Sequence, residues 1–320
     1  MTEKRVLITG AAGFVGFHLA RFLQARGDRV LGIDNFNDYY QPQLKRDRAR
    51  ELSHSGIRTI DGDITDPLLL QDALVKHNTT HVVHLAAQAG VRYSIVNPQA
   101  YVTANITGFL NILEACRHHN GVVLTYASSS SVYGTNTKIP FSTSDPTDHQ
   151  ASFYGVTKKT NELMAYTYHH LYGIPVTGLR FFTVYGPWGR PDMAYFSFTK
   201  DILEGKPIDL YNYGHMRRDF TYVDDIIQGT VAAMDLGASC EVFNLGNHHP
   251  EPISELISAI EEALGKKASV RHLPMQAGDV EATYADISNS RLMLNFTPKT
   301  SLKEGIFKFV DWYKGYFDLN

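Results

Sequence analysis

The sequence predicts a doubly wound α/β fold, in which helices cover both faces of a parallel sheet, with a smaller C-terminal α/β region. The first half of the 320-residue chain alternates short apolar runs with segments of helical periodicity. The runs are nearly continuous in Val, Ile and Leu, as in strands that are buried on both faces. A glycine-rich turn follows the first run. Ligands of such folds bind at the carboxyl ends of the strands.

The elements follow from these patterns in chain order. Strands are expected at residues 5–9, 29–34, 58–63, 81–87, 122–128 and 176–184, and helices at residues 14–25, 41–53, 66–76, 98–118 and 153–171. From residue 181 glycine, proline and aromatic clusters interrupt the pattern, and further helices are expected at residues 254–264 and 303–316. A strand near residues 242–247 is expected to return to the large sheet. We therefore divide the chain into residues 1–180 and 181–320.

Composition excludes several classes of protein. Hydrophobic residues make up 43% and charged residues 20%, which is typical of a soluble globular protein and not of a disordered one. The formal net charge of −3 disfavours nucleic acid as a partner. No apolar run approaches the roughly 20 residues that cross a bilayer, so we expect no membrane association. Two cysteines suit a reducing compartment, and we expect a cytoplasmic location.

Two charged patterns are assigned to no function. None of the 14 histidines has the spacing of a metal site, so we expect no metal. The basic run at residues 45–50, Lys-Arg-Asp-Arg-Ala-Arg, is interpreted as a solvated helix face.

The glycine-rich turn predicts a dinucleotide site. Its contacts are expected from Gly10, Gly13, Phe14, Val15 and Gly16, which follow the first strand and begin the first helix. Such glycines allow a tight turn and close approach to a pyrophosphate, and the helix amino terminus favours an anion. Asp34 ends the second strand, where a carboxylate accepts hydrogen bonds from a ribose and repels a 2′-phosphate, which favours NAD. The alternative is a structural turn beside a capping Asp34.

Later strand ends extend the predicted NAD site. Ala86 and Ala87 are small enough to let a ligand approach the backbone. We expect further cofactor contacts from Asn35, Phe36, Asp63, Ile64, Leu85, Ala86, Ala87, Gln88, Asn105, Tyr154, Lys158 and Phe182. Ordinary strand-end turns are the alternative.

A Ser, Tyr and Lys group predicts the chemistry. Tyr154 and Lys158 are four residues apart on an expected helix and therefore project from one face. A free phenol has a pKa of about 10, and lowering this pKa to about 7 requires roughly 4 kcal/mol. The Lys158 ammonium and an oxidised nicotinamide together can supply this. Ser129, which follows the fifth strand, can share a hydrogen bond with the same substrate oxygen. Chance pairing on a helix is the alternative.

The sequence resembles the extended short-chain dehydrogenase/reductase family of nucleotide-sugar enzymes over essentially its whole length. The matching elements are residues 10–16, 63–64, Asn105 with Gly108, 128–134, Tyr154 with Lys158, and 218–220. The strings at residues 86–94, 180–193 and 218–225 look like those of UDP-glucuronate 4-epimerases. The resemblance implies a Rossmann-type NAD-binding domain over residues 1–180 and a nucleotide-sugar-binding domain mainly over residues 181–320.

The resemblance also implies a reaction. NAD takes a hydride from C4 of the sugar, Tyr154 takes the hydroxyl proton, and the 4-keto sugar turns over before the hydride returns. UDP-glucuronate would become UDP-galacturonate. The nearest alternative is a 4-epimerase of neutral UDP-hexoses in which Arg190 is idle, and a more remote one is a non-catalytic NAD-binding protein.

Relatives with other reactions differ just after Ser129. Sugar 4,6-dehydratases of this family carry Asp-Glu where this chain has Ser130-Ser131, and glucuronate decarboxylases carry Glu in place of Ser131. We expect Ser130, Ser131, Thr183 and Arg190 to hold the sugar carboxylate. The alternatives are that the serines cap their own backbone and that Arg190 lies at the surface or faces a phosphate.

The resemblance places the nucleotide and a partner chain. Arg218 would hold the diphosphate with help from Arg92, while Tyr211 and the stretch from Gln276 to Asp279 would flank uracil and ribose. Relatives commonly carry proline where this chain has Ala277. A homodimer is expected to form through the helices at residues 98–118 and 153–171.

Overall fold

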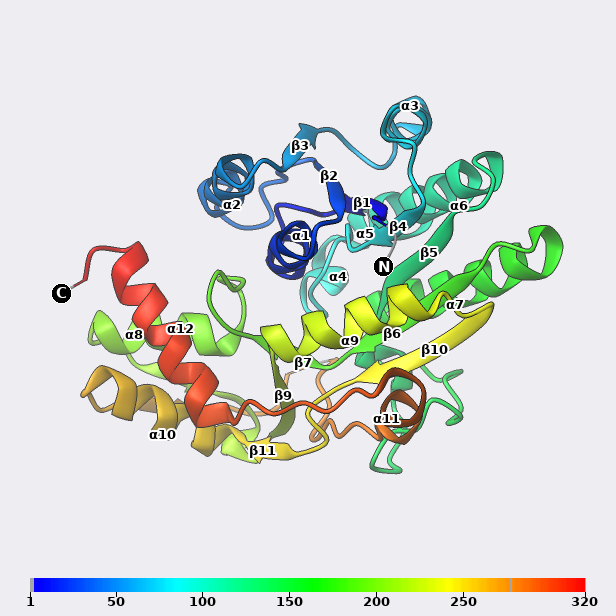
Figure 1. Ribbon diagram of the computed structural model, residues 1–320. Coiled ribbons are helices and arrows are strands. Elements are labelled where there is room, and N and C mark those ends of the chain that lie inside the picture. Colours follow the sequence, from blue (N-terminus) through cyan, green and yellow to red (C-terminus); the bar gives the residue numbers. More distant parts are fainter. Residues whose placement is uncertain (1–2, 277, 320) are drawn as a thin grey trace.

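A seven-stranded parallel sheet forms the centre of the molecule in the computed structural model, which describes residues 3–276 and 278–319 (Figure 1). The strand order is β10-β6-β5-β4-β1-β2-β3, and each neighbouring pair is parallel. The strands are β1 (Arg5–Thr9), β2 (Arg29–Asp34), β3 (Arg58–Asp61), β4 (His81–His84), β5 (Val123–Ser129), β6 (Val176–Phe181) and β10 (Cys240–Leu245). The predicted doubly wound α/β fold is therefore confirmed.

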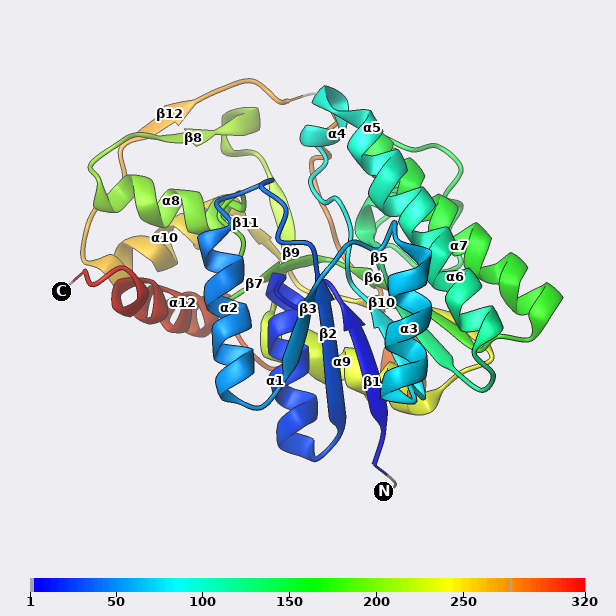
Figure 2. The ribbon, with the colours of Figure 1, turned by 90° about the horizontal axis from the view of Figure 1, so that it is seen from above.

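Helices cover both faces of this sheet (Figure 2). Helices α1 (Phe14–Arg26), α2 (Gln43–His54) and α9 (Val223–Leu236) lie on one side, and α3 (Pro67–His77), α6 (Gly108–His118) and α7 (Phe153–Tyr172) lie on the other. Local chemistry sets several boundaries. The Ser152 side chain accepts a hydrogen bond from the Gly155 N–H at the start of α7, and Gly173 ends that helix in a left-handed conformation.

Two expected elements are divided in the structure. Instead of one helix at residues 98–118, the chain forms α5 (Pro98–Tyr101), the π-helix η1 (Val102–Thr107) and α6, after a short α4 (Tyr93–Val96). The expected strand at residues 176–184 ends with β6 at Phe181. Strand β7 (Thr183–Tyr185) then enters a second sheet, so the chain leaves the large sheet at Phe182.

The smaller region contains two short sheets and several helices. Strands β7 and β9 (Arg217–Tyr222) are parallel, and β11 (Pro250–Pro252) pairs antiparallel with β9. Strand β8 (Ile208–Leu210) pairs with β12 (Val270–His272). Helices α8 (Ala194–Leu203), α10 (Ile253–Leu264), α11 (Ser288–Leu294) and α12 (Leu302–Tyr316) complete it. Helices α8, α9 and α11 were not predicted.

The two regions share one hydrophobic core. Side chains from α1 and α2 belong to the same cluster as side chains from α8, α10 and α12. Strand β10 returns to the large sheet beside β6, as predicted. The division at residue 180 remains a prediction, because α9 and β10 from the later half also build the sheet region. A common core holds the cleft between the regions in a defined shape.

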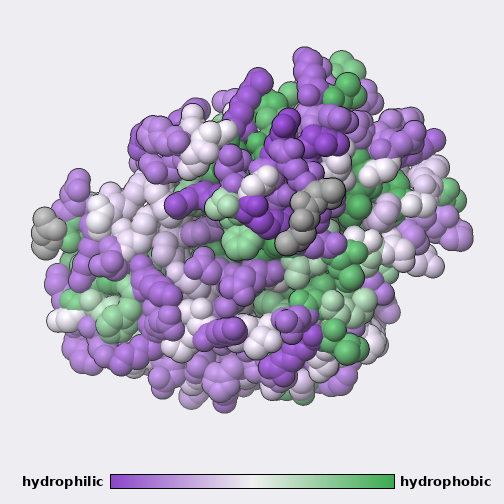
Figure 3. Space-filling view, viewed as in Figure 1, coloured by the Kyte–Doolittle hydropathy of each residue, from purple (hydrophilic) through white to green (hydrophobic). Residues whose placement is uncertain are grey.

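The surface is mostly polar on the face seen in Figure 3, with apolar residues more frequent on the side where α6 and α7 lie. Over the described ranges, 3–276 and 278–319, no helix combines the length and the apolar character needed to cross a bilayer.

Candidate active site

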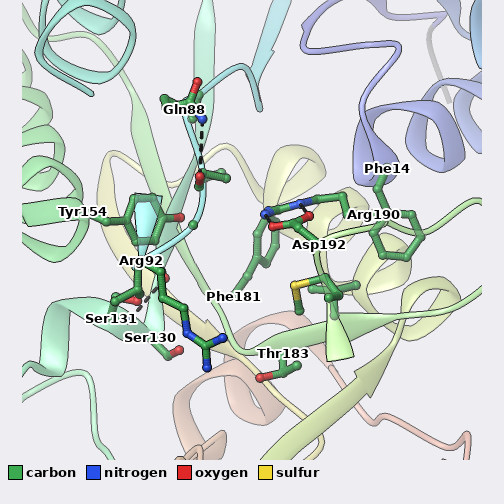
Figure 4. Close-up of a pocket in the computed structure, with 18 of the residues that line it drawn as sticks. Phe14, Gln88, Arg92, Ser130, Ser131, Tyr154, Phe181, Thr183, Arg190 and Asp192 are labelled. Carbon is green, nitrogen blue, oxygen red and sulfur yellow. Dashed lines mark hydrogen bonds and ion pairs between the residues drawn. The ribbon is translucent and has the colours of Figure 1, made fainter. Parts of the chain in front are cut away.

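A cavity of about 880 Å³ lies at the carboxyl ends of the strands and is lined by both regions of the chain. It borders β1, where the strand order reverses between β2 and β4. This is the position at which open α/β sheets bind their ligands. In Figure 4 Tyr154 points its hydroxyl into the cavity from one side, and Arg190 and Asp192 lie opposite.

Two glycines of the glycine-rich turn lie so close to neighbouring backbone that no side chain fits there. Gly10 has a φ of +72°, and a Cβ there would lie 2.7 Å from the Ala86 backbone nitrogen. A Cβ at Gly16 would lie 2.1 Å from the Gly10 carbonyl oxygen. Among the described residues no side chain caps the start of α1, so first-turn N–H groups remain available to an anion. This cradle fits the pyrophosphate of a dinucleotide.

Asp34 is hydrogen-bonded to the glycine-rich turn, as the capping alternative expects, and its contact with a ribose stays a prediction. Its Oδ2 accepts a hydrogen bond from the Ala12 N–H at 3.0 Å, and its Oδ1 accepts one from the Phe36 N–H at 2.9 Å. Burial raises the pKa of this carboxyl group, while these hydrogen bonds and the Lys45 charge oppose the rise. Asp34 therefore braces the turn and also lines the cavity.

Most predicted site residues line the cavity, although they come from many separate segments. They are Gly10, Gly13, Phe14, Val15, Gly16, Asp34, Asn35, Asp63, Ile64, Leu85, Ala86, Ala87, Gln88, Arg92, Ser129, Ser130, Ser131, Tyr154, Lys158, Phe182, Thr183, Arg190, Tyr211, Arg218 and Asp279.

Asn105 is a predicted cofactor contact that the structure places behind the cavity wall. Its side chain accepts a hydrogen bond from the Gln88 N–H at 2.8 Å and donates to the Gln88 carbonyl and to the Thr157 hydroxyl, both at 3.0 Å. All of these partners belong to the protein, so Asn105 joins the loop after β4 to α7. Its role in the structure is to position the wall.

Phe36 and Gln276 also lie outside the cavity lining. The Phe36 ring is buried under the Arg46 guanidinium, at 5.1 Å from the ring centroid. The Oε1 atom of Gln276 is buried without a hydrogen-bond partner among the described residues. Ala277 lies outside the described residues.

Lys158 and Tyr154 project from α7 as predicted. Lys158 is buried and donates a hydrogen bond to the Ala127 carbonyl at 2.9 Å. Burial lowers the pKa of Lys158 to about 8. Burial raises the pKa of the Tyr154 phenol, and a hydrogen bond with Ser129 and the charge of Arg190 oppose this rise. Burial outweighs these two opposing effects in the protein without a cofactor. The acidification expected from Lys158 together with an oxidised nicotinamide stays a prediction.

The serines at the end of β5 and just after it have different roles: one caps a short helix, and the other two face the cavity. The Ser129 Oγ accepts a hydrogen bond from the Ser131 N–H at 3.1 Å and so caps the short 3-10 helix η2 (Ser130–Tyr133). Ser129 therefore caps the backbone and also lines the cavity. The capping alternative concerns Ser130 and Ser131, whereas it is the Ser129 side chain that caps. Ser130 and Ser131 face the cavity close to Tyr154 (Figure 4).

Arg190 forms an ion pair that the sequence analysis missed. Its Nε donates to the Asp192 Oδ1 at 3.0 Å, and its Nη2 donates to Oδ2. The Tyr39 hydroxyl donates to the same carboxylate at 3.1 Å, from the loop between β2 and α2. Asp192 and Tyr39 both line the cavity. The opposite charge two residues after Arg190 is the sequence signal that points to Asp192.

A second basic group, formed by Arg92 and Arg218, also lines the cavity. Arg92 pairs with Asp279 at 3.0 Å, and its guanidinium lies 4.7 Å from the centroid of the Tyr211 ring. Arg218 donates to the backbone carbonyls of Arg217 and Glu281. Burial lowers the pKa of Arg218, and the Asp279 carboxylate opposes this change. Residues far apart in the chain thus meet where a diphosphate and a uridine are expected.

Comparison with known proteins is consistent with this geometry. The model of the NAD dependent epimerase/dehydratase family matches residues 6–246. The chain belongs to this family. Its cofactor is NAD, which the cradle at Gly10 fits.

The most similar proteins include UDP-glucuronate 4-epimerase 3 of Arabidopsis thaliana, which is 51% identical over 98% of this chain and 77% of the plant protein. Protein CapI of Staphylococcus aureus is 49% identical over 98% of this chain and 99% of its own. The UDP-glucuronic acid 4-epimerase from Bacillus cereus in complex with UDP-glucuronic acid and NAD has a TM-score of 0.91 at 38% identity, covering 97% of this chain and 99% of that one. These findings confirm the resemblance to UDP-glucuronate 4-epimerases.

Among residues 3–276 and 278–319, no three His, Cys, Asp or Glu side chains are arranged to hold a metal ion.

Proposed function

We propose that this chain interconverts UDP-glucuronate and UDP-galacturonate by NAD-dependent epimerisation at C4. The observation that carries the proposal is one continuous cavity. Its lining includes the glycine-rich cradle, Tyr154, and the three arginines Arg190, Arg92 and Arg218. Such a cavity can hold a dinucleotide and an acidic nucleotide sugar together.

NAD, when bound, supplies the acceptor and the later donor of the C4 hydride. Tyr154 takes the C4 hydroxyl proton and returns it after the sugar has turned over. Ser129 bonds the phenol and holds it in place, and the Lys158 ammonium supplies positive charge on the same helix face. Arg92 and Arg218 hold the diphosphate, so the sugar can rotate while the nucleotide stays bound.

The residues proposed to hold the sugar carboxylate would keep the 4-keto intermediate from decarboxylating, so that the reaction ends at epimerisation. A 4-keto glucuronate is a β-keto acid and can lose carbon dioxide. We infer that Arg190, Thr183, Ser130 and Ser131 hold its carboxylate in the plane of the adjacent ring bonds, which disfavours this loss. Hydroxyl groups at residues 130 and 131 cannot serve as the acid and base of an elimination.

A product assay tests the proposal. Purified protein with NAD is incubated with UDP-glucuronate or with UDP-glucose, and products are identified by proton NMR. We expect UDP-galacturonate, little turnover of UDP-glucose and no UDP-pentose. A clear preference for UDP-glucose would contradict the acid-sugar assignment, and UDP-pentose as the main product would indicate a decarboxylase.

One observation favours the alternative substrate class. Arg190 already has a carboxylate partner in Asp192, so a neutral sugar would leave no charge unpaired. A 4-epimerase of neutral UDP-hexoses is therefore the second candidate, and the same assay separates the two.

We infer that the chain forms a homodimer through α6 and α7. Exposed apolar side chains recur along α7 at Val156, Leu163 and Tyr166, and Leu110 is exposed on α6. The spacing of these α7 residues places them on one helix face. A cytoplasmic location is also proposed; Cys116 and Cys240 are free thiols, as suits a reducing compartment.

A further inference from the structure

We propose that Arg48 is a positioning residue that connects the glycine-rich turn to the loop carrying Arg190, so that the cofactor cradle and the carboxylate end of the substrate site are held in one geometry. This inference rests on the proposed function in one respect, the contact of Arg190 with the sugar carboxylate.

Arg48 belongs to the basic run interpreted from sequence as a solvated helix face, and the structure corrects that interpretation. The residue is 0% exposed, and Lys45 and Asp47 on the same helix are buried too. Among the described residues no carboxylate forms a salt bridge with Arg48. A buried cation is costly unless polar groups surround it. The polar groups that surround the Arg48 guanidinium therefore indicate the role of this residue.

The Arg48 guanidinium divides its donors between two segments more than 130 residues apart in the chain. Its Nη1 donates to the Ala12 carbonyl at 3.0 Å and to the Tyr40 hydroxyl at 2.9 Å. Its Nε and Nη2 donate to the Trp188 carbonyl at 3.1 and 2.6 Å, and Nη2 also reaches the Gly189 carbonyl at 3.0 Å. The Arg48 side chain thus joins the glycine-rich turn to the loop before Arg190.

At the cofactor end, Arg48 acts on a residue that Asp34 also holds. The Ala12 N–H donates to Asp34, and the Ala12 carbonyl accepts from Arg48. Ala12 lies inside the turn between Gly10 and Gly13, so both of its backbone polar groups are fixed. A shift of Arg48 would therefore move the turn that is expected to contact the pyrophosphate.

At the substrate end, Arg48 holds a strained segment. Trp188 has a φ of +59°, a left-handed conformation that a bulky residue rarely adopts. This conformation persists because Arg48 binds the carbonyl while the indole packs on Phe17 and Trp312, with ring centroids 5.2 and 5.3 Å away. Two residues later the chain reaches Arg190, whose guanidinium faces the cavity beside Asp192.

The chemistry requires arginine at this position. A guanidinium is planar and presents five donors in fixed directions, so it can serve carbonyls on two sides at once. A lysine ammonium keeps the charge but is a compact group on a flexible stem, and it cannot reach both segments with the same geometry. The Arg48→Lys variant therefore keeps the positive charge but loses the hydrogen bonds that join the two segments.

The test is a double-mutant cycle on binding. Dissociation constants for UDP-glucuronate, UDP and NAD are measured by calorimetry for wild type, Arg48→Lys, Arg190→Met and the double variant. Arg50→Met is the matched control, because Arg50 is an exposed arginine on the same helix that pairs with Asp47. Melting temperatures establish that each variant is folded.

If Arg48 acts through Arg190, Arg48→Lys weakens UDP-glucuronate binding by about ten-fold and NAD binding by several-fold, while UDP binding changes by less than about two-fold. The double variant then binds UDP-glucuronate no more weakly than Arg190→Met alone. Arg50→Met stays near wild type for all three ligands.

The proposal is overturned if the effects of Arg48→Lys and Arg190→Met multiply, or if UDP binding falls as much as UDP-glucuronate binding. Should Arg48→Lys not fold, Arg48→Gln replaces it, and a failure of both to fold would also overturn the proposal by making Arg48 a requirement of the fold itself. A wild-type protein that does not bind UDP-glucuronate would instead refute the proposed function, and the NAD measurement would still test the connection to the turn.

Discussion

Tyr154 is subject to opposing effects of burial and hydrogen bonding. Burial raises the pKa of its phenol, whereas Ser129 and Arg190 act to lower it. The positive charge that the sequence analysis assigned to Lys158 lies on the same helix, but its ammonium donates to the Ala127 carbonyl. We therefore expect acidification of the phenol to require the positive charge of a bound oxidised nicotinamide.

Replacing Tyr154 by Phe tests the proton-transfer role. We expect kcat to fall by about 10³-fold, within the usual range for losing a general acid–base group. Binding of UDP-glucuronate should change little, since the ring and its packing remain. Steady-state kinetics and calorimetry measure the two effects. Near-normal turnover would refute the assignment of Tyr154 as the base.

Replacing Lys158 by Met tests the energetic cost of the buried ammonium. The pKa of Lys158 lies at about 8 in the folded protein, below its ordinary value of 10.5, so the folded state disfavours the charged form. The unfolded chain binds the extra proton between these pH values, and the cost is therefore full below pH 8 and disappears as the pH rises toward 10.5.

We expect the nucleotide-free Lys158→Met variant to be more stable than wild type by roughly 1–3 kcal/mol at about pH 7, and to be inactive. The gain should shrink as the pH approaches 10.5, the ordinary pKa of a lysine. Chemical denaturation at about pH 7, 8.5 and 10 measures the difference. A variant that is less stable at every pH would show that packing of the lysine stem outweighs desolvation of its charge.

Among the secondary-structure elements, the π-helix η1 places Asn105 where it can join three segments. Asn105 bonds both backbone groups of Gln88 and the Thr157 hydroxyl, and its own carbonyl accepts from the Asn161 side chain at 2.6 Å. Helix α7, which carries Tyr154, is thereby fixed to the loop after β4. A helical period does not reveal a π turn, and the sequence therefore predicted an uninterrupted helix.

Replacing Asn105 by Ala should destabilise the protein by roughly 2–3 kcal/mol, because the buried polar groups of Gln88 lose their partners. We also expect a lower kcat, since α7 is then less firmly positioned. Asn111→Ala is the control: Asn111 lies on α6 and donates to the Ile64 carbonyl at 3.1 Å. Urea unfolding and kinetics compare the two. Equal losses of stability would contradict the positioning role of Asn105.

Helix α2 shows why charge patterns mislead. Its buried face includes Lys45, Asp47 and Arg48 beside Leu44 and Leu52. Sequence periodicity counts apolar residues and assigns the charged ones to solvent. Some partners of these charges are close in sequence: Lys45 donates to Asn37, and Gln43 donates to Asp47. The carbonyls of Ala12 and Trp188 that surround Arg48, and the Tyr316 hydroxyl that bonds Asp47, come from distant segments, which no local pattern contains.

The proposed assembly of two whole molecules is tested by placing charge on the α7 face. Leu163 and Tyr166 are 57% and 62% exposed, so a Leu163→Glu substitution leaves the core of the monomer intact. We expect this variant to elute at monomer mass, because a buried carboxylate without a partner disfavours the interface. Light scattering after size exclusion measures the mass.

The matched control is Leu292→Glu, since Leu292 is 85% exposed on α11. This control should retain the mass of the wild type. A wild-type protein that elutes at monomer mass over a wide range of concentration would contradict the dimer.

Local patterns were sufficient to predict the parallel sheet, the glycine-rich turn and the projection of Tyr154 and Lys158 from one helix face. Strand and helix periods repeat within a few residues, and four residues make about one turn of a helix. Gly10 and Gly16 leave no space for a Cβ, so the turn itself requires glycine at these positions. The long motif strings also indicated the family, because their resemblance extends over many consecutive residues.

Which polar groups meet could be seen only in the folded chain. The fold brings the Tyr39 hydroxyl to the Asp192 carboxylate that pairs with Arg190, bonds Asn105 to the loop after β4, and encloses Arg48 between two distant segments. The physical reason is that a charged side chain is buried or exposed according to partners that folding brings to it from far along the chain. The carbonyl partners of Arg48 at residues 12 and 188 leave no trace in the sequence around it, whereas the Asp192 partner of Arg190 is only two residues away.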